Sequence, residues 1–351
     1  MSLSKRQRIE SNYQSKILKE AINSSYRSAG IKYGVDAKTA YNIAERKFFK
    51  IFNDKNYEEK KFVNKLYIEA DEDHINLKNK NKGYIKLIYV HEGYRYNDIK
   101  KCNELINVKY FSSNENSRSI WLRVKEYIDT VYYPGTPISI SGDGASWIKQ
   151  GLRYFSFSKF YLDKFHVYKA ITGLTKNNKD KRDEYLKRIE AKDIEFFKAE
   201  YYKRYKKDAK KDDSSNKMKG LVYLINNIEH IDLSTKNRCS AEGHISNVLS
   251  KRMSSRPMGW SRKGANIMAG YLAFSRNGGK IENLFEKIDT NNILCDRIKS
   301  IGEKEYSIER KREVPAQNSY TILGLEGLQD KISEKLKSVL SQCKSVLPRI
   351  L

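Results

Sequence analysis

Three acidic residues stand where the chain is expected to change direction, and carboxylates at such places can hold metal ions. Asp143 lies between Gly142 and Gly144, directly after the apolar stretch 138–140. Glycines on both sides let the backbone turn sharply and let a ligand come close. An acid presented where a strand passes into a helix is a common way to hold a metal ion or a nucleophile. Because Gly-Asp-Gly is also an ordinary turn sequence, this motif alone does not decide between the two.

Asp71 and Glu242 are the other two acids of this kind. Asp71 directly continues the alternating run 66–70, which predicts a strand, and Glu242 lies at the start of a predicted helix. Three carboxylates gathered at element ends are costly unless a cation neutralises them. Mg²⁺ or Mn²⁺ prefers such oxygen ligands. We therefore expect Asp71, Asp143 and Glu242 to bind two divalent ions that serve phosphoryl transfer.

The elements around these acids predict an α/β fold. Apolar or alternating runs predict strands at 66–70, 84–90, 105–111, 138–140 and about 154–157. Helical periodicity predicts helices at 117–132, 145–150 and after 162. Three strands, a helix, a strand, a helix and a strand is the order of the ribonuclease H-like fold, a mixed sheet flanked by helices. Asp71 and Asp143 would then lie side by side, where ligands gather in open α/β sheets.

Composition divides the chain into three predicted parts. They are a helical region at 1–60, a ribonuclease H-like catalytic domain at 61–280 with a helical insertion at about 180–235, and a linker with a C-terminal helix at 281–351. The charge runs of the insertion indicate solvated helix faces. The first helices begin without the elements that usually open a DNA-binding domain, so we expect a start that is shortened.

The helical region at 1–60 is compatible with a helix-turn-helix. A predicted helix at 37–49 follows a short glycine-containing turn and directs Lys38, Asn42 and Arg46 outward. Such a helix would bind DNA. A small helical hairpin that packs on the next domain is the alternative.

The charge of the chain calls for a polyanionic partner. The 68 basic and 43 acidic residues give a formal charge of +25, which makes nucleic acid the first candidate. No apolar run approaches the ~20 residues of a membrane-spanning helix, so a membrane is less suitable. The four cysteines form no CxxC pair, which fits a reducing cytoplasm and argues against a zinc finger. A basic run at 250–264 suits phosphate contacts through Lys251, Arg252, Arg256, Arg262 and Lys263.

Several sequence blocks occur together and in a fixed order. They are Tyr-Ile-Glu-Ala-Asp-Glu-Asp-His at 67–74, Gly-Asp-Gly-Ala-Ser-Trp-Ile at 142–148, Leu-Asp-Lys-Phe-His at 162–166, and Ser-Ala-Glu-Gly-His-Ile-Ser at 240–246, which continues through 254–260. Over roughly residues 10–280, the chain resembles bacterial transposases of the ISLre insertion-sequence family, which are relatives of Mutator-like DDE transposases.

The resemblance implies a DDE triad of Asp71, Asp143 and Glu242, dependence on a divalent metal, and cleavage and joining of DNA strands. Asp73 is the alternative first acid. Asp163 and His166 resemble the Cys/Asp-x-x-His element of Mutator-like enzymes and would orient DNA or support the site. A helix N-cap beside a partly buried histidine is their structural alternative. Family members usually have a longer N-terminal region, which puts independent recognition of transposon ends in doubt.

These patterns predict a bacterial DNA transposase that is cytoplasmic and associates with the nucleoid when bound to DNA. Its partners would be double-stranded DNA at transposon ends and target sites. Pairing two ends implies a homodimer or a larger assembly. A truncated, catalytically inactive remnant that only binds DNA is the main alternative. A nuclease of the same fold, which would hydrolyse DNA without strand transfer, is a third.

Overall fold

The fold is known from a computed structural model, and the residues that it describes belong to one compact unit, Met1–Glu286. The described residues are 8–52, 59–78, 81–176, 178–208, 214–234, 239–256 and 258–285. The linker and C-terminal helix are predicted at 281–351. Residues Ile281–Phe285 form a 3₁₀ helix that packs on the core, and the rest of that range lies outside the described residues.

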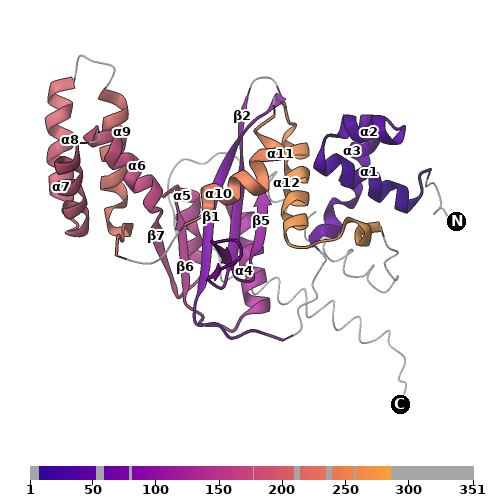
Figure 1. Ribbon diagram of the computed structural model, residues 1–351, viewed down its shortest axis with the longest axis horizontal. Coiled ribbons are helices and arrows are strands. Elements are labelled where there is room, and N and C mark those ends of the chain that lie inside the picture. Colours follow the sequence, from indigo (N-terminus) through magenta and orange to yellow (C-terminus); the bar gives the residue numbers. More distant parts are fainter. Residues whose placement is uncertain are drawn as a thin grey trace, which may run out of the picture. The chain divides into compact units, whose positions relative to one another are not determined.

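A five-stranded mixed sheet organises this unit (Figure 1). The strand order is β5-β2-β1-β6-β7. β2 is antiparallel to both β1 and β5, whereas β6 is parallel to β1 and β7 is parallel to β6. The strands are β1 (Leu66–Asn76), β2 (Lys82–His91), β5 (Lys109–Ser113), β6 (Ile138–Gly142) and β7 (Ser158–Leu162). The expectation of a mixed sheet flanked by helices is therefore confirmed.

Two strand predictions were wrong in position. The run 105–111 is interrupted at Asn107, which has a φ of 50°. Residues before the break form a separate hairpin of β3 (Tyr94–Asn97) and β4 (Cys102–Leu105), and β5 begins after it. The aromatic run at 154–157 is not a strand, because a 3₁₀ helix (Gln150–Tyr154) leads into it and its aromatic rings pack on Trp121.

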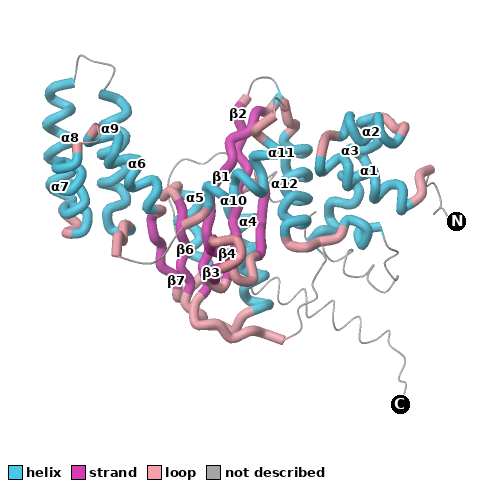
Figure 2. The backbone as a smooth tube through the Cα atoms, viewed as in Figure 1, coloured by secondary structure: helices cyan, strands magenta, loops and turns pink. Residues whose placement is uncertain are grey.

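Helices cover both faces of the sheet (Figure 2). Side chains alternate along a strand, so β1 contributes Ile68 to one hydrophobic cluster and Ile75 to the other. The helices α4 (Ser117–Val131), α5 (Ser146–Lys149) and α6 (Lys164–Thr175) pack on the first cluster. The helices α10 (Ala241–Ile245), α11 (Lys251–Met253) and α12 (Arg262–Arg276) pack on the second.

Three N-terminal helices extend the second cluster. They are α1 (Ser11–Asn23), α2 (Tyr26–Tyr33) and α3 (Ala37–Lys47). Ile17 and Ile43 are fully buried in that cluster, and the hydroxyl of Tyr271 on α12 donates to the carbonyl of Ala44 at 2.7 Å. On α3, Lys38, Asn42 and Arg46 are exposed, as the helical spacing predicts. Their binding to DNA remains a prediction.

Four helices follow β7 and include the predicted insertion (Figure 1). They are α6, α7 (Lys179–Glu190), α8 (Ile194–Asp208) and α9 (Ser214–Asn227). α6 packs against α9, and both contribute to the cluster that also contains α4. Among the helices that the structure describes, none has both the length and the apolar content to cross a lipid bilayer.

Candidate active site

Asp71 on β1 and Asp143 directly after β6 lie at the same level of the sheet, because β1 and β6 are parallel. The register pairs Glu69 with Ser141, and each acid stands two residues further along the chain. Neighbouring strands are about 4.8 Å apart, so this register brings the two carboxylates close together. We expected Asp71 at the end of β1, and this was wrong. The strand continues to Asn76, paired with β2. Asp71 lies where the pairing with β6 ends.

Two glycines shape the turn that holds Asp143. A Cβ on Gly142 would come within 2.7 Å of the carbonyl oxygen of Ala70, so β6 leaves the sheet in close contact with β1. Gly144 has a φ of 93°, which favours glycine. The carboxylate of Asp143 accepts a hydrogen bond from the N–H of Ala145 at 2.9 Å. This turn fixes the acid at the start of α5.

The helix that carries Glu242 is held near β1 by Glu69, a residue that the sequence motifs did not single out. The Glu69 carboxylate accepts hydrogen bonds from the N–H of Ser240 at 2.6 Å and from its hydroxyl at 3.2 Å. Ser240 is the residue before α10, and Glu242 lies in the first turn of that helix. β1 therefore carries Asp71 and also holds the start of the helix that carries Glu242. The chain continues from α10 into a π-helix, Ser246–Ser250, a form frequent at functional sites.

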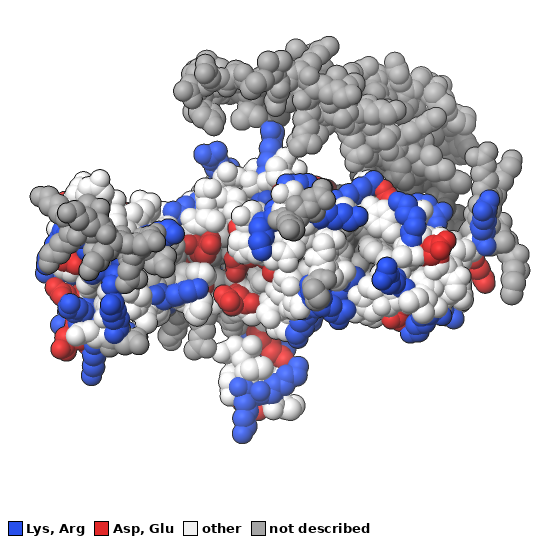
Figure 3. Space-filling model, turned by 90° about the horizontal axis from the view of Figure 1, so that it is seen from above, with Lys and Arg blue, Asp and Glu red and all other residues white. Residues whose placement is uncertain are grey.

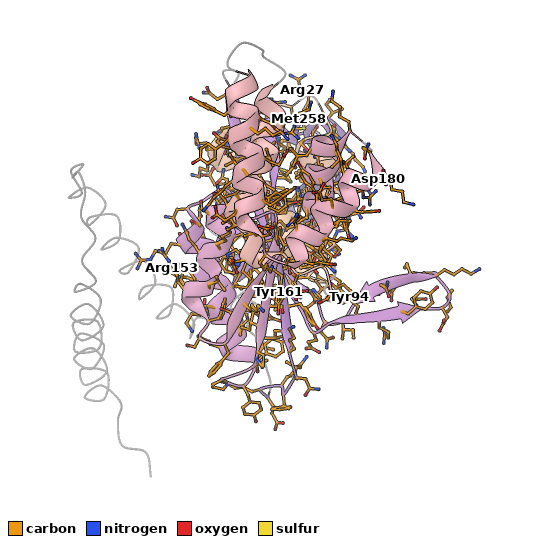
Figure 4. The ribbon with its side chains drawn as sticks, turned by 90° about the vertical axis from the view of Figure 1, so that its left-hand side faces the viewer. Arg27, Tyr94, Arg153, Tyr161, Asp180 and Met258 are labelled. Carbon is orange, nitrogen blue, oxygen red and sulfur yellow. The ribbon has the colours of Figure 1, made fainter. Side chains whose placement is uncertain are left out.

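The Glu69 carboxylate is buried in a hydrogen-bonded cluster. The hydroxyls of Tyr89 and Tyr94 donate to it, and Nε2 of His91 lies 3.1 Å from it. Burial alone would raise the pKa of Glu69, but these hydrogen bonds outweigh burial and lower it to about 2. Tyr94 comes from the base of the β3–β4 hairpin, which projects from the sheet (Figure 4). The sequence offered one signal that Glu69 is important: it is an acid at an inward-facing position of an otherwise apolar strand.

The charges of Asp143 and Glu242 both act on Asp71. Burial is the main cause that raises the pKa of Asp71 to about 6, and the charges of Asp143 and Glu242 raise it further. A hydrogen bond from the N–H of Glu72, 2.8 Å long, and the nearby His166 oppose the shift. All three acids predicted from the sequence are thus within electrostatic range of one another.

Asp73, the alternative first acid, has a different environment. It is buried, and one carboxylate oxygen accepts a hydrogen bond from the Ser254 hydroxyl at 2.9 Å. Burial raises its pKa, and the groups that oppose the shift are Ser254, Ser250 and His74. The charges of Asp143 and Glu242 are not among the main causes of this shift. The geometry therefore favours Asp71 as the partner of the other two acids.

Asp163 and His166 lie beside this cluster. The Asp163 carboxylate accepts a hydrogen bond from the N–H of Phe165 at 3.0 Å and caps α6. His166 Nε2 is 3.8 Å from the Asp163 carboxylate. Burial is the main cause of a raised pKa for Asp163, and Glu242 is among the charges that add to it. The predicted helix cap is present, and its partner His166 is also near Asp71.

The carboxylate oxygens of the acid cluster are the kind of ligand that Mg²⁺ and Mn²⁺ prefer. In the described part of the chain, no three His, Cys, Asp or Glu side chains are arranged to hold a metal. Glu242 is exposed and its carboxylate has no hydrogen-bond partner among the described residues, so it can turn without losing one. A divalent cation would offset the like charges that raise the pKa of Asp71. Asp71, Asp143 and Glu242 are the residues that would hold it.

The predicted phosphate-binding arginine Arg252 is not on the surface. Its side chain is 4% exposed and donates to the carbonyls of Ala21 and Ile22 at 3.2 and 3.0 Å. Its guanidinium also lies over the Trp260 ring, 5.1 Å from the centroid. These contacts hold the C-terminal end of α1 against α11 and Trp260, so Arg252 has a structural role in this fold.

The other predicted DNA ligands of the basic run have varied surroundings. Lys251 donates to the Asn247 side chain at 2.9 Å. Arg256 donates to the carbonyl of Ser24 at 3.2 Å, and the ammonium of Lys263 pairs with Glu45. Arg262 is the exposed first residue of α12. All four are near the surface, where binding of phosphate remains a prediction.

A five-stranded mixed sheet with an acid cluster beside β1 and β6 defines an α/β protein with a candidate metal-dependent site. Residues 1–287 match the model of a family described as "Uncharacterised protein family (UPF0236)". The chain therefore belongs to the UPF0236 family.

Three similar proteins of this family come from Caldanaerobacter subterraneus subsp. tengcongensis. One UPF0236 protein is 35% identical over 323 residues, which cover 89% of this chain and 66% of that relative, and its name joins eleven locus designations. Another, whose name joins four, is 32% identical over 321 residues, covering 89% of this chain and 66% of its own length. A third is 32% identical, with 63% of its length covered. The chain thus spans about two thirds of these relatives.

Proposed function

We propose that this chain is a DDE-type DNA transposase with a ribonuclease H-like fold, which cleaves the ends of an insertion sequence and joins them to target DNA. The proposal rests on one observation, the grouping of Asp71, Asp143 and Glu242 from three separate elements. These are the residues that the resemblance to ISLre-family transposases assigns to the triad.

The sheet supports the fold assignment. Numbered by their order in the chain, the five strands lie in the sequence 3-2-1-4-5, with the second antiparallel to its neighbours and the rest parallel. This is the arrangement that we expect of a ribonuclease H-like sheet. The central strand β1 carries Asp71, and Asp143 directly follows the adjacent strand β6. The third acid comes from a helix after the insertion.

The relatives support a mobile element. One of them is named from eleven loci and another from four, all in one bacterium. Genes present in many copies in one genome are typical of insertion sequences. The formal charge of +25 adds independent support, because a transposase must bind double-stranded DNA at both the ends and the target.

Two displacements on phosphorus make up the proposed reaction. In the first, a water oxygen bonds to the phosphorus at the transposon end, the bond to the 3′ oxygen breaks, and that oxygen leaves as a hydroxyl. In the second, this 3′-hydroxyl bonds to a target phosphorus and displaces another 3′ oxygen. Mg²⁺ held by the three acids would supply charge stabilisation for both displacements. The chain itself orients the acids through Glu69, Ser240 and the turn at Asp143.

A strand-transfer assay tests this function. Full-length protein is incubated with Mg²⁺ or Mn²⁺ and with DNA that carries the sequences flanking its gene, beside Asp143→Ala and Glu242→Ala. Asp129→Asn, an exposed acid on α4, is the matched control. We expect joined products from the wild type and from the control but none from the two triad variants.

The other outcomes identify the alternatives. Cleavage without joining would indicate a nuclease. DNA binding without either reaction would indicate an inactive remnant, the second function considered for this chain. Equal activity in the triad variants and the wild type would exclude the proposed site.

A further inference from the structure

A groove of about 500 Å³ lies between α6 and α9, beside the acid cluster. Three lysines line it: Lys169, Lys217 and Lys219. Gly173 and Gly220 also line it, and a Cβ at Gly173 would meet no atom within 4 Å. Glycine therefore leaves this part of the groove open to an approaching backbone.

The two helices that form the groove carry no acid, unlike their neighbours. Neither the α6 sequence nor the α9 sequence contains Asp or Glu. The adjacent α7 and α8 mix both charges and form ion pairs such as Arg188 with Asp193 and Lys198 with Glu195. Among the described residues, Lys169 and Lys219 have no acidic partner within ion-pair distance. A concave surface with one sign of charge attracts polyanions.

The groove adjoins the candidate site. His166, which lines the groove, is one of the charges that act on Asp71. Tyr223, also in the lining, donates its hydroxyl to the backbone carbonyl of Asp143 at 2.9 Å. Figure 3 shows acidic side chains near the middle of one face, with Lys and Arg on both sides of them. A strand bound in the groove would therefore lead to the acids.

We propose that the groove between α6 and α9 binds the sugar–phosphate backbone of the DNA strand on which the acid cluster acts. The proposal rests on the function proposed above. It assigns the DNA contact to α6 and to α9 of the predicted insertion, whose charge runs the sequence indicated to be solvated faces. Lys169, Lys217 and Lys219 contact phosphates, and Gly173 gives the backbone room. These contacts are independent of base sequence.

Binding measured without chemistry tests the groove separately from the reaction. The triple variant Lys169→Gln, Lys217→Gln and Lys219→Gln is compared with Lys179→Gln, Lys181→Gln and Lys187→Gln, a triple variant on α7 with the same charge change. Fluorescence anisotropy of a labelled duplex is followed with the full chain, in EDTA, at several salt concentrations. Far-UV circular dichroism checks that both variants are folded.

We expect the groove variant to bind DNA more weakly and with a smaller salt dependence. Each phosphate contact contributes about 0.9 to the slope of log K against log salt, so the slope should fall by about 2–3. The α7 variant should keep the wild-type slope. Equal losses in both variants, or no loss in the groove variant, would overturn the proposal. A groove that binds polyglutamate, with unchanged DNA affinity in the groove variant, would also overturn it in favour of an acidic protein partner.

The result stays separable from the fate of the proposed function. If the wild type joins strands while the groove variant binds DNA normally, the groove assignment fails and the transposase stands. If the groove variant loses binding but no wild-type reaction occurs, the groove stands as a DNA site and the transposase function fails.

Discussion

The Glu69 carboxylate accepts a hydrogen bond from the backbone N–H of Ser240, 171 residues away in the chain, at 2.6 Å. This bond joins the strand that carries Asp71 to the helix that carries Glu242. A charge-assisted hydrogen bond in a buried position is strong and directional. It fixes the position of α10, which carries Glu242, relative to β1, which carries Asp71.

Replacing Glu69 should loosen α10. In Glu69→Gln, the uncharged amide cannot accept all the hydrogen bonds that the carboxylate accepts, and the partners left unpaired should lower the free energy of unfolding by roughly 3 kcal/mol. Hydrogen exchange should become faster at residues 239–245 than elsewhere. Glu104→Gln, which removes a partly exposed acid from the hairpin, should leave that exchange unchanged. Unaltered protection of α10 in the Glu69 variant would show that the bond does not hold the helix.

The choice between the two candidate first acids can be measured directly. Asp71→Asn should lose binding of Mn²⁺, followed by electron paramagnetic resonance, because the charges of Asp143 and Glu242 act on Asp71. Asp73→Asn should keep that binding, because its environment is Ser254, Ser250 and His74. Strand transfer should likewise be lost in Asp71→Asn and kept in Asp73→Asn. The reverse order would place the metal on the other acid of β1.

The close contact of β6 with β1 makes Gly142 sensitive to substitution. In Gly142→Ala, the new Cβ would lie 2.7 Å from both the Ala70 carbonyl oxygen and the Ile148 side chain. We expect a loss of about 1–3 kcal/mol in the free energy of unfolding, measured by urea denaturation. Gly173→Ala is the control, since its Cβ meets nothing within 4 Å and alanine favours a helix interior by up to about 1 kcal/mol. Similar losses in both variants would contradict the contact.

Arg252 should matter for folding and not for DNA. Arg252→Met would leave the carbonyls of Ala21 and Ile22 without their donor, at a cost of roughly 2–3 kcal/mol. Lys251→Met, one residue earlier and exposed, should change unfolding little. The DNA affinity of folded Arg252→Met, measured at low temperature, should match that of the wild type. A selective loss of DNA affinity would restore Arg252 as a phosphate ligand.

His230 should make stability fall on the acidic side of neutrality. Burial lowers its pKa below 6.5, the charges of Lys149 and Lys192 lower it further, and Glu229 opposes them. As the pH falls below 6.5, the unfolded chain binds a proton at His230 before the folded protein does. The free energy of unfolding therefore decreases as the pH falls from 6.5 to the lower pKa of the folded state. His230→Phe removes this loss. The variant should therefore gain stability relative to the wild type between pH 7.5 and 5, and a pH-independent difference in urea midpoint would refute this.

Much of the fold follows from local sequence. Alternation and helical period place β1, β2, β6 and α4, and glycines place the turn around Asp143, because these depend on nearest neighbours in the chain. The strand predicted for the aromatic run 154–157 was wrong. Tyr154 and Phe155 pack on Trp121, and the strand begins only at Ser158. The acids themselves could be selected from residue type and position.

Only the tertiary structure decided how those acids are held. Nothing in local periodicity shows that Glu69 would accept the N–H of Ser240, that Arg252 would be buried against α1, or that α6 and α9 would form one cationic groove. Each of these depends on contacts between segments far apart in the chain. Burial and pairing in space set the energies of charged groups, and sequence spacing alone does not contain them.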